Sequence, residues 1–595
     1  MTEHTLYDRE EPALSPFERG LYDDVSTDEP WALLERFADL ERVSGTEDER
    51  AAADYVTERL DALDVSHELF TPELYISQPH DATVSIESPT QTDFPSAKTV
   101  AFSNDETIRG EAVHVETEDS DELAGAFDVG LDVDHLKGDV AGKVIVVESI
   151  LPIEAIGELA KAGAAAFVGI HPHDEEPHEG IATPVWGGVP DPWSDEEIPD
   201  IVVANLSRRE GDQLLDQLDE HGTVEVEVSA STTTDWMECP LVLAQVEGEA
   251  APDTDDFVLL HGHIDSWYEG ITDNATGDAG MLETARVFND HRDELERDLW
   301  VAWWPGHSTG RYAGSTWFVD EYAHQLHEHC VAHVNMDSPG VKGATEFYVR
   351  PKWMPDADGL CRGAIDDVAG KDTEENRPPR AGDYSFNNLG ITGMSLQSCL
   401  PAEVREERGY HPVGGSGGHA DAWHLSTDTI EKADPEVLVR DVQVFATAVA
   451  RLTNADYLPL DHRRSVEHFH TSIDYYESHG GDAIDLNPVR EALNALGDDL
   501  ERLYSAIDED AIEPETANRA IVELSRRLVR LDFAERGPFQ QDPAVYRPPL
   551  PLLGKAVAVD SLDDEARFAE VHLRRARNHV VHELRQAAAA VRTAL

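Results

Sequence analysis

Lysine and cysteine are both scarce in this chain. Its 595 residues include 9 lysines and 4 cysteines. The cysteines are far apart in the sequence and form no C-x-x-C pair: they are Cys239, Cys330, Cys361 and Cys399. Cysteines in this pattern are expected to be free thiols in a reducing compartment.

Long apolar runs are missing as well. No stretch approaches the roughly 18 consecutive apolar residues that predict a transmembrane helix. The first residues, MTEHTLYDREEPALSP, contain neither the basic nor the apolar segment of a secretory signal peptide. We therefore expect no membrane contact and a cytoplasmic location.

Positive charge is the largest deficit. Lys and Arg number 46 against 120 Asp and Glu, which gives a net charge of −74. The acidic residues are spread along the whole chain, which fits a protein adapted to molar salt, where a Debye length of about 3 Å screens self-repulsion. The same field repels nucleic acid and anionic membranes, so neither is expected as a partner. A disordered acidic chain is not favoured, because many apolar segments are periodic.

The length predicts two to four domains. Residues 28–64 read as two helices, and residues 76–235 read as short β-rich runs with one Ala-rich helix at 153–167. From 241 to 455 strands and helices alternate, which predicts an α/β domain around a mostly parallel sheet. Its strands are expected at 241–248, 256–262, 298–306, 330–337, 345–349 and 392–398, and two of its helices at 278–290 and 314–326.

After residue 460 the pattern becomes helical. Two leucine-rich stripes have 3-4-3 spacing: Leu493, Leu496, Leu500 and Leu503, then Ile521, Leu524, Leu528 and Leu531. A third helix is expected from residue 563 to the end of the chain. Such helices form either an oligomerisation element or a set that packs on the α/β domain.

Histidine and aspartate gather where strands are predicted to end. The segment HGHIDSWYEGITDNATG, residues 261–277, directly follows an apolar strand. The candidate residues there and at later strand ends are His263, Asp265, Asp273, Asp337 and His424. Active sites of α/β sheets form at the carboxyl ends of strands, and paired histidines and carboxylates suit zinc. Two zinc ions that share a carboxylate can hold a water molecule and a scissile carbonyl.

These motifs resemble those of the co-catalytic dizinc exopeptidases, a family that includes bacterial and archaeal aminopeptidases, glutamate carboxypeptidase and the transferrin receptor. The matching motifs occur in the family's order: SGTEDERAAADYV, GHIDSW, GITDNATGDAGMLETAR, GRYAGSTWF, NMDSPG, DYSFNNLGITG and HLSTDT. The resemblance implies a zinc-peptidase-like α/β domain made of residues 1–75 and 236–458. It also implies a protease-associated (PA) domain inserted at 76–235 and a helical dimerisation domain at 459–595.

The resemblance further implies a role for each candidate residue. His263, Asp273 and Asp337 would hold one zinc ion. Asp273 would bridge to a second zinc ion, which His424 would also bind. Asp265 would orient His263, and the Asp273–Asn274 peptide bond would be cis.

The chain departs from the family at the catalytic glutamates. The family's Gly-Glu-Glu-x-Gly segment supplies a general base and a ligand of the second zinc, whereas residues 306–310 read Gly-His-Ser-Thr-Gly. His307 then takes the base position and Ser308 the ligand position. Three interpretations stay open: His307 replaces a missing function, the site holds one metal ion, or the site is inactive.

The five retained site residues favour an active enzyme. We expect a zinc-dependent exopeptidase acting on peptides as a homodimer, with aminopeptidase favoured over carboxypeptidase. His307 and Asp265 are its candidate catalytic residues, and zinc, in two copies, is its expected cofactor. The alternative is a non-catalytic, receptor-like binding or scaffold protein with a degenerate metal site.

Other polar residues near these motifs receive weaker interpretations. His261 is expected to be buried structure, whereas His411 and His419 are either loop residues or substrate contacts. Asp383 is expected to support the site, through packing. The remaining candidates, which are not assigned, are arginines that could bind a substrate carboxylate: Arg311, Arg377 and Arg380.

Overall fold

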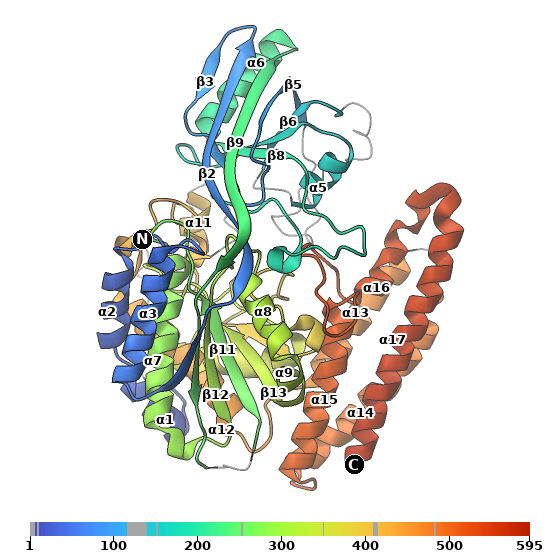
Figure 1. The fold of residues 1–595 in the computed structure, drawn as a ribbon. Helices are drawn as coiled ribbons and strands as arrows, with labels where there is room; N and C mark the ends of the chain where they lie inside the picture. Colours follow the sequence, from blue (N-terminus) through green and yellow to red (C-terminus); the bar gives the residue numbers. More distant parts are fainter. Residues whose placement is uncertain are drawn as a thin grey trace.

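The computed structural model describes most of the chain. The described residues are 6–8, 11–115, 140–149, 153–250, 254–348, 350–407, 415–419, 421–480 and 483–595. They form a sheet flanked by helices, a second sheet above it, and a group of long C-terminal helices beside it (Figure 1).

The first sheet has seven strands. Their order is β1 (Ser66–Phe70), β10 (Leu241–Val246), β12 (Asp298–Trp304), β11 (Phe257–His263), β13 (Cys330–Asn335), β15 (Thr392–Ser395) and β14 (Lys352–Trp353). β12, β11, β13 and β15 run parallel to one another, and the outer strands pair antiparallel. The α/β architecture is therefore the predicted one, with a parallel centre and antiparallel edges that the pattern did not predict.

Helices cover both faces of this sheet. Val258 and Leu260 of β11 are buried on one face, and Phe257 and Leu259 on the other. The first face packs against α1 (Pro16–Asp24), α2 (Asp28–Phe37), α3 (Glu47–Ala62), α7 (Thr276–Asp290), α10 (Asp358–Ala369) and α12 (Pro435–Asn454). The second face packs against α8 (Ala313–Glu321) and α9 (Ala323–His329). A strand covered on both faces is apolar along its length, so the polar residues of the site lie at and beyond its carboxyl end.

The second sheet is reached along two long strands. β2 (Glu73–Ser88) leaves the first sheet and β9 (Glu225–Glu238) returns to it, and the two pair antiparallel (Figure 1). The other strands are β3 (Thr92–Phe94), β4 (Lys98–Thr99), β5 (Thr107–Val115), β6 (Val144–Glu148), β7 (Ala166–Ile170) and β8 (Val202–Leu206), and α6 (Arg208–His221) follows β8.

Some predictions of secondary structure were wrong in detail, and α6 was not predicted. The Ala-rich segment is not one helix: α5 (Ile153–Lys161) ends before Gly163, whose φ of +86° only glycine adopts easily, and β7 follows. The strand expected at 345–349 is also absent among its described residues, where Glu346 and Phe347 form only isolated bridges. The neighbouring strand is β14, whose two residues pair with β15.

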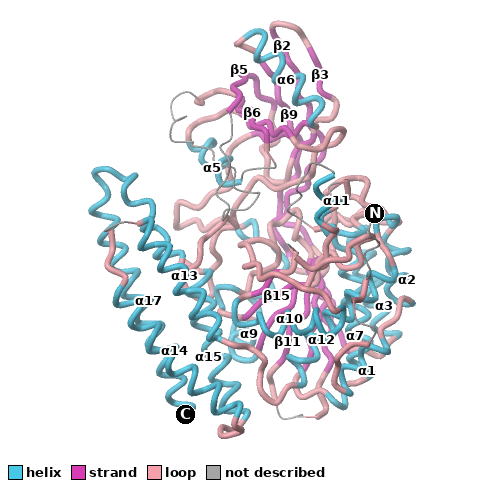
Figure 2. The backbone as a smooth tube through the Cα atoms, turned by 180° about the vertical axis from the view of Figure 1, so that it is seen from behind, coloured by secondary structure: helices cyan, strands magenta, loops and turns pink. Residues whose placement is uncertain are grey.

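The C-terminal helices are α13 (His462–His479), α14 (Asn487–Asp508), α15 (Pro514–Phe533) and α17 (Ala566–Ala594), seen from behind in Figure 2. The predicted leucine stripes are buried in their interior, except that Ile521 packs into the core of the α/β domain; α13 was not predicted. Arg526 of α15 donates to the carbonyls of Leu326 and Cys330, so the bundle is also anchored on the α/β domain. Within the described residues, no helix has the length and apolarity needed to cross a membrane.

Candidate metal centre

The candidate residues meet at the carboxyl edge of the first sheet. His263 is the last residue of β11, and Asp337 follows the end of β13. Asp273 lies in the turn that leads into α7, and His424 lies in the loop before α12. Asp273, Asp337 and His424 line one cavity together with His307.

Three of these residues converge on one point. A ring nitrogen of His263 and one carboxylate oxygen each from Asp273 and Asp337 lie within 4.8 Å of one another. His263 Nε2 is 3.1 Å from Asp273 Oδ1, and Nδ1 donates to the Asp265 carbonyl over 2.9 Å. Because Nδ1 carries that proton, Nε2 is the nitrogen that would bind a cation, in place of the proton that it shares with Asp273.

A second imidazole faces the other oxygen of Asp273. His424 Nε2 is 3.6 Å from Asp273 Oδ2, and Nδ1 donates over 3.1 Å to the carbonyl of Glu179. Asp273 therefore lies between two histidines that present the same ring nitrogen. The Asp273–Asn274 peptide bond is cis, as the resemblance implied.

The cluster carries buried negative charge. Burial raises the pKa of Asp337, and the charge of Asp273 adds to this effect. Burial also disfavours ionised Asp273, but the hydrogen bond and charge of His263 outweigh it and lower the pKa of Asp273 to about 2. Burial lowers the pKa of His424 to about 4, so this ring is neutral at pH 7. A cation would neutralise the buried carboxylates, and the imidazole and carboxylate donors fit zinc.

Two residues that the sequence did not single out hold the backbone of the site. Asp428 accepts hydrogen bonds from Thr272 N, Thr272 Oγ1 and Asp273 N. Arg42, fully buried, donates to the carbonyls of residues 264, 269 and 270. Asp428 belongs to the HLSTDT motif, which could have identified it, whereas Arg42 has no comparable signal.

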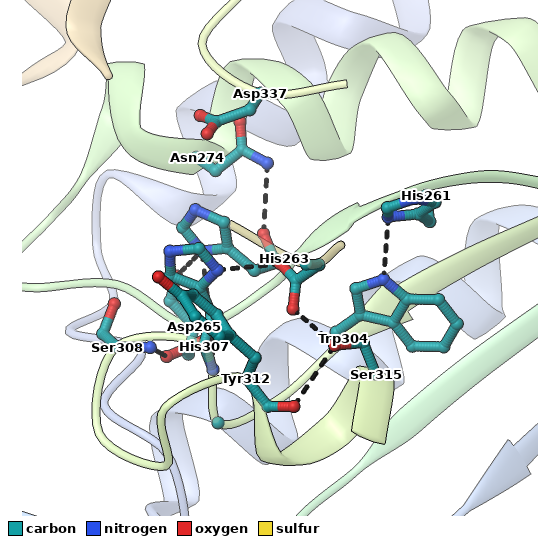
Figure 3. Close-up of polar contacts among 12 residues, drawn as sticks. His261, His263, Asp265, Asn274, Trp304, His307, Ser308, Tyr312, Ser315 and Asp337 are labelled. Atoms are coloured by element: carbon teal, nitrogen blue, oxygen red, sulfur yellow. Dashed lines mark hydrogen bonds and ion pairs between the residues drawn. The ribbon is translucent and has the colours of Figure 1, made fainter. Parts of the chain in front are cut away.

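His307 lies directly on the ring of His263. The two ring centroids are 3.9 Å apart with an interplanar angle of 13° (Figure 3). His307 Nδ1 is 2.8 Å from Asp383 Oδ2, and Asp383 also accepts from Ser315 Oγ over 2.8 Å. Burial opposes ionisation of Asp383, but the charge and hydrogen bond of His307 outweigh it and lower the pKa of this carboxyl. The contact leaves His307 Nε2 available to a ligand in the cavity.

Asp265 acts differently from the expectation. Its carboxylate accepts from the backbone N–H groups of His307 and Ser308, over 3.1 and 2.9 Å. The carboxylate lies 3.7 Å from His263 Nδ1, and the shorter contact to that nitrogen comes from the Asp265 carbonyl. The side chain of Asp265 therefore fixes the loop that carries the substituted positions, and its backbone orients His263.

Of the polar residues given weaker interpretations from the sequence, some line the cavity and others are buried away from it. His261 is fully buried and bonded to His333 and Trp304, away from the cavity, as predicted (Figure 3). His419 contacts the Lys342 carbonyl and lies off the cavity, and His411 falls outside the described residues. Ser308 and Arg311 line the cavity.

Comparison with known proteins gives the family of this domain. Residues 242–449 match the model of peptidase family M28. This segment is an M28 peptidase domain. A mouse protein named aminopeptidase NAALADL1 is 31% identical over 128 residues, which are 20% of this chain and 16% of the mouse protein. Chicken transferrin receptor protein 1 is 22% identical over 319 residues, or 50% of this chain and 39% of the receptor.

The fold of the M28 domain is shared with solved structures. An aminopeptidase from Aneurinibacillus sp. strain AM-1 superposes with a TM-score of 0.55 at 17% identity, covering 73% of this chain and 96% of that chain. This similarity supports the architecture. The curated relatives are matched over much less of their length, since this chain spans under half of each of the two named above.

Proposed function

We propose that the protein is a zinc-dependent exopeptidase that hydrolyses a terminal peptide bond, with aminopeptidase favoured over carboxypeptidase. The observation that carries this proposal is the convergence of His263, Asp273 and Asp337 within 4.8 Å in an M28 domain. His424, on the far oxygen of Asp273, extends the cluster toward a second site.

The donors divide between two zinc positions. His263, Asp273 and Asp337 would hold one ion, and Asp273 and His424 would hold a second. When bound, zinc would polarise the scissile carbonyl and lower the pKa of the attacking water. The carbonyls of Asp265 and Glu179 keep Nε2 of each histidine turned toward Asp273.

His307 supplies the base in this proposal. Because Asp383 holds the Nδ1 proton, Nε2 can accept a proton from the attacking water as its oxygen bonds to the carbonyl carbon. The same nitrogen then protonates the departing amine as the C–N bond breaks. The products are a free amine and a carboxylic acid, whose proton then passes to the amine or to solvent, and His307 returns to its starting state.

The remaining parts of the chain have supporting roles in the proposal. Residues 76–235 would form an inserted PA domain, and residues 459–595 a dimerisation domain joined to the α/β domain of residues 1–75 and 236–458. The acidic surface would suit a cytoplasm rich in salt. Light scattering in molar potassium chloride tests the dimer, since a monomer mass would remove it.

Metal content and peptide hydrolysis, measured on the same preparation, test the central proposal. We expect two zinc ions per chain and chelator-sensitive cleavage of amino-acid amides or short peptides. His307→Ala should abolish cleavage while zinc content stays at two, as a base requires. Loss of one zinc ion in this variant would instead make His307 a ligand. A wild-type chain that binds no zinc and cleaves nothing would favour the receptor-like binding protein.

A further inference from the structure

The catalytic cavity has a cationic wall. Besides the carboxyl groups of the metal cluster and of Glu179, it is lined by Arg311, Arg350 and Lys352. The whole chain has 46 basic residues against 120 acidic ones, so three basic side chains around one cavity are more than its composition would lead one to expect. Neither Arg350 nor Lys352 was singled out from the sequence.

Arg311 is the best-defined of the three. It lies between β12 and α8, in the loop that carries His307, and is 7% exposed. Nη2 donates to the carbonyl of Ala544 over 3.2 Å, and the guanidinium lies 5.2 Å from the centroid of the Tyr312 ring. Among the described residues no carboxylate pairs with Arg311, and its Nε has no hydrogen-bond partner. A buried guanidinium in this state is costly unless a ligand completes its contacts.

The backbone of Arg311 is fixed in an unusual conformation. Its φ is +51° and that of Tyr312 is +72°, values that side-chain-bearing residues seldom adopt. The carbonyl of Arg311 accepts from Gly187 N over 2.7 Å, in the loop between β7 and β8. Contacts from the second sheet and from Ala544 of the C-terminal region therefore fix the arginine against the cavity. Strain of this kind is found mainly at functional positions.

The rest of the wall is rich in hydrogen-bond donors. Arg350 is 5% exposed, and burial, with the charge of Arg350, lowers the pKa of Lys352 to about 8. Tyr384 and Gln397 also line the cavity. The Tyr384 hydroxyl and Gln397 Nε2 have no partner within the described part of the chain. A buried donor without a partner is unfavourable, and an acceptor from a ligand would offset that cost.

The other two arginines considered from the sequence serve the framework. Arg377 donates to Asp532 and to the carbonyl of residue 547. Arg380 donates to the carbonyl of Asp542 and lies over the Trp186 ring. Neither lines the cavity. Among the three arginines left unassigned by sequence, the structure therefore separates Arg311 from the others.

We propose that Arg311, with Arg350 and Lys352, binds a substrate carboxylate close to the scissile bond. A guanidinium binds a carboxylate through two parallel hydrogen bonds, which favours an acid over its amide. The carboxylate is either the free terminus of a short peptide or an acidic side chain. This inference rests on the proposed peptidase function and narrows it to substrates that carry a negative charge beside the cleaved bond.

Four dipeptide substrates test the inference in molar potassium chloride with zinc. Alanyl-alanine against alanyl-alaninamide tests a terminal carboxylate. The α-amides of alanyl-glutamate and alanyl-glutamine test an acidic side chain. Wild type should show a kcat/KM at least about tenfold higher for the acidic member of one pair, the size expected for a hydrogen-bonded charge. Arg311→Gln should lose about 10- to 100-fold on that member and little on its neutral partner.

Three further variants separate a specific role of Arg311 from a general loss of charge or of folding. Arg311→Lys keeps the charge but loses the paired hydrogen bonds, so its preference should be intermediate. Arg519→Gln removes a charge from an exposed residue of α15 and should leave the preference unchanged. If Arg311→Gln does not fold, Lys352→Gln, on the edge strand β14, should reduce the same preference. Equal kcat/KM for acid and amide in wild type, or a preference that Arg311→Gln and Lys352→Gln both retain, would overturn the inference.

Failure of the proposed function has a different signature. If zinc-loaded wild type cleaves none of the four peptides, the peptidase proposal fails. Calorimetric titration with alanyl-alanine and alanyl-alaninamide then tests the cationic wall by itself. Tighter binding of the acid by wild type, lost in Arg311→Gln, supports the carboxylate site, and equal binding of acid and amide removes it.

Discussion

Asp383→Asn tests whether His307 acts as a base that is held by a buried carboxylate. The carboxylate is 1% exposed and holds His307 Nδ1 at 2.8 Å while it also accepts from Ser315 Oγ. An amide has the same shape but no charge, and its NH₂ group, if turned to His307, would favour the ring form with its proton on Nε2. That form cannot accept a proton from water.

The size of the effect follows from these contacts. A hydrogen bond to a charged group contributes about 1.5–3 kcal/mol, and 1.36 kcal/mol is a factor of ten, so losing the charge alone lowers kcat about 10- to 150-fold. The wrong ring form adds to this loss, and the equivalent change in a Ser-His-Asp triad costs about 10⁴ in kcat. We therefore expect kcat to fall by about 10² to 10⁴.

The assay compares kcat, KM and zinc content in wild type, Asp383→Asn and Ser315→Ala. Zinc content should not change in either variant, because neither residue contacts His263, Asp273, Asp337 or His424 through a hydrogen bond. Ser315→Ala removes a hydroxyl that donates to the other oxygen of Asp383 and also contacts Ser385 Oγ and the Tyr312 carbonyl. It leaves the Asp383 carboxylate on His307 Nδ1, so kcat should fall by about tenfold or less.

Two outcomes would refute this reasoning. If Asp383→Asn retains kcat within about threefold at full zinc content, His307 does not act as a base held by Asp383. If the loss of kcat follows a loss of zinc, the Asp383–His307 pair belongs to the metal site instead. A changed melting temperature alone would not produce either result, because kcat is measured on the folded, zinc-loaded fraction.

Three further outcomes are expected. His263→Ala should bind at least one zinc ion fewer by elemental mass spectrometry, since Nε2 would be a ligand; an unchanged zinc content contradicts the ligand assignment. Burial, with the charge of Asp265, raises the pKa of Glu49 well above its usual range. Wild-type stability should therefore fall as pH rises from about 4.5 through that raised pKa, because the folded state holds a proton that the unfolded state releases. Glu49→Gln should gain urea midpoint over wild type at pH 8 relative to pH 5, while the exposed Glu47→Gln shows no such trend; a difference independent of pH counts against the shift. Dialysis from molar salt to about 0.1 M should lower the melting temperature, because the screening length grows from about 3 to about 10 Å; equal melting temperatures would exclude salt adaptation.

The metal cluster could be predicted from sequence because its residues follow strand ends. His263, Asp337 and the turn around Asp273 each come directly after or beside an apolar strand, and parallel strands end at a common edge. The contact between His307 and Asp383 could not be predicted in the same way. It joins loops 76 residues apart, and its geometry depends on how Ser315 and Asp383 pack.

The errors in secondary structure have local causes. The segment at 345–349 has strand-like residues, but in the fold Phe347 faces the core and its backbone meets Thr373 at a single bridge. Sequence also could not rank Arg311 above Arg377 and Arg380, because all three are arginines in loops. Only the tertiary contacts distinguish a guanidinium that lines the cavity from two that bond the C-terminal region.

The hydrogen bond from His424 to the Glu179 carbonyl joins residues 245 positions apart and crosses between two parts of the molecule. The acceptor belongs to the loop after β7, whereas the imidazole belongs to the M28 domain. A shortened protein without residues 73–238 would keep His263, Asp273 and Asp337 but leave His424 free to rotate. The two sheets therefore cannot be exchanged independently between relatives. A replacement for the second sheet must place a backbone carbonyl where that of Glu179 lies, or the His424 ring is no longer oriented toward Asp273.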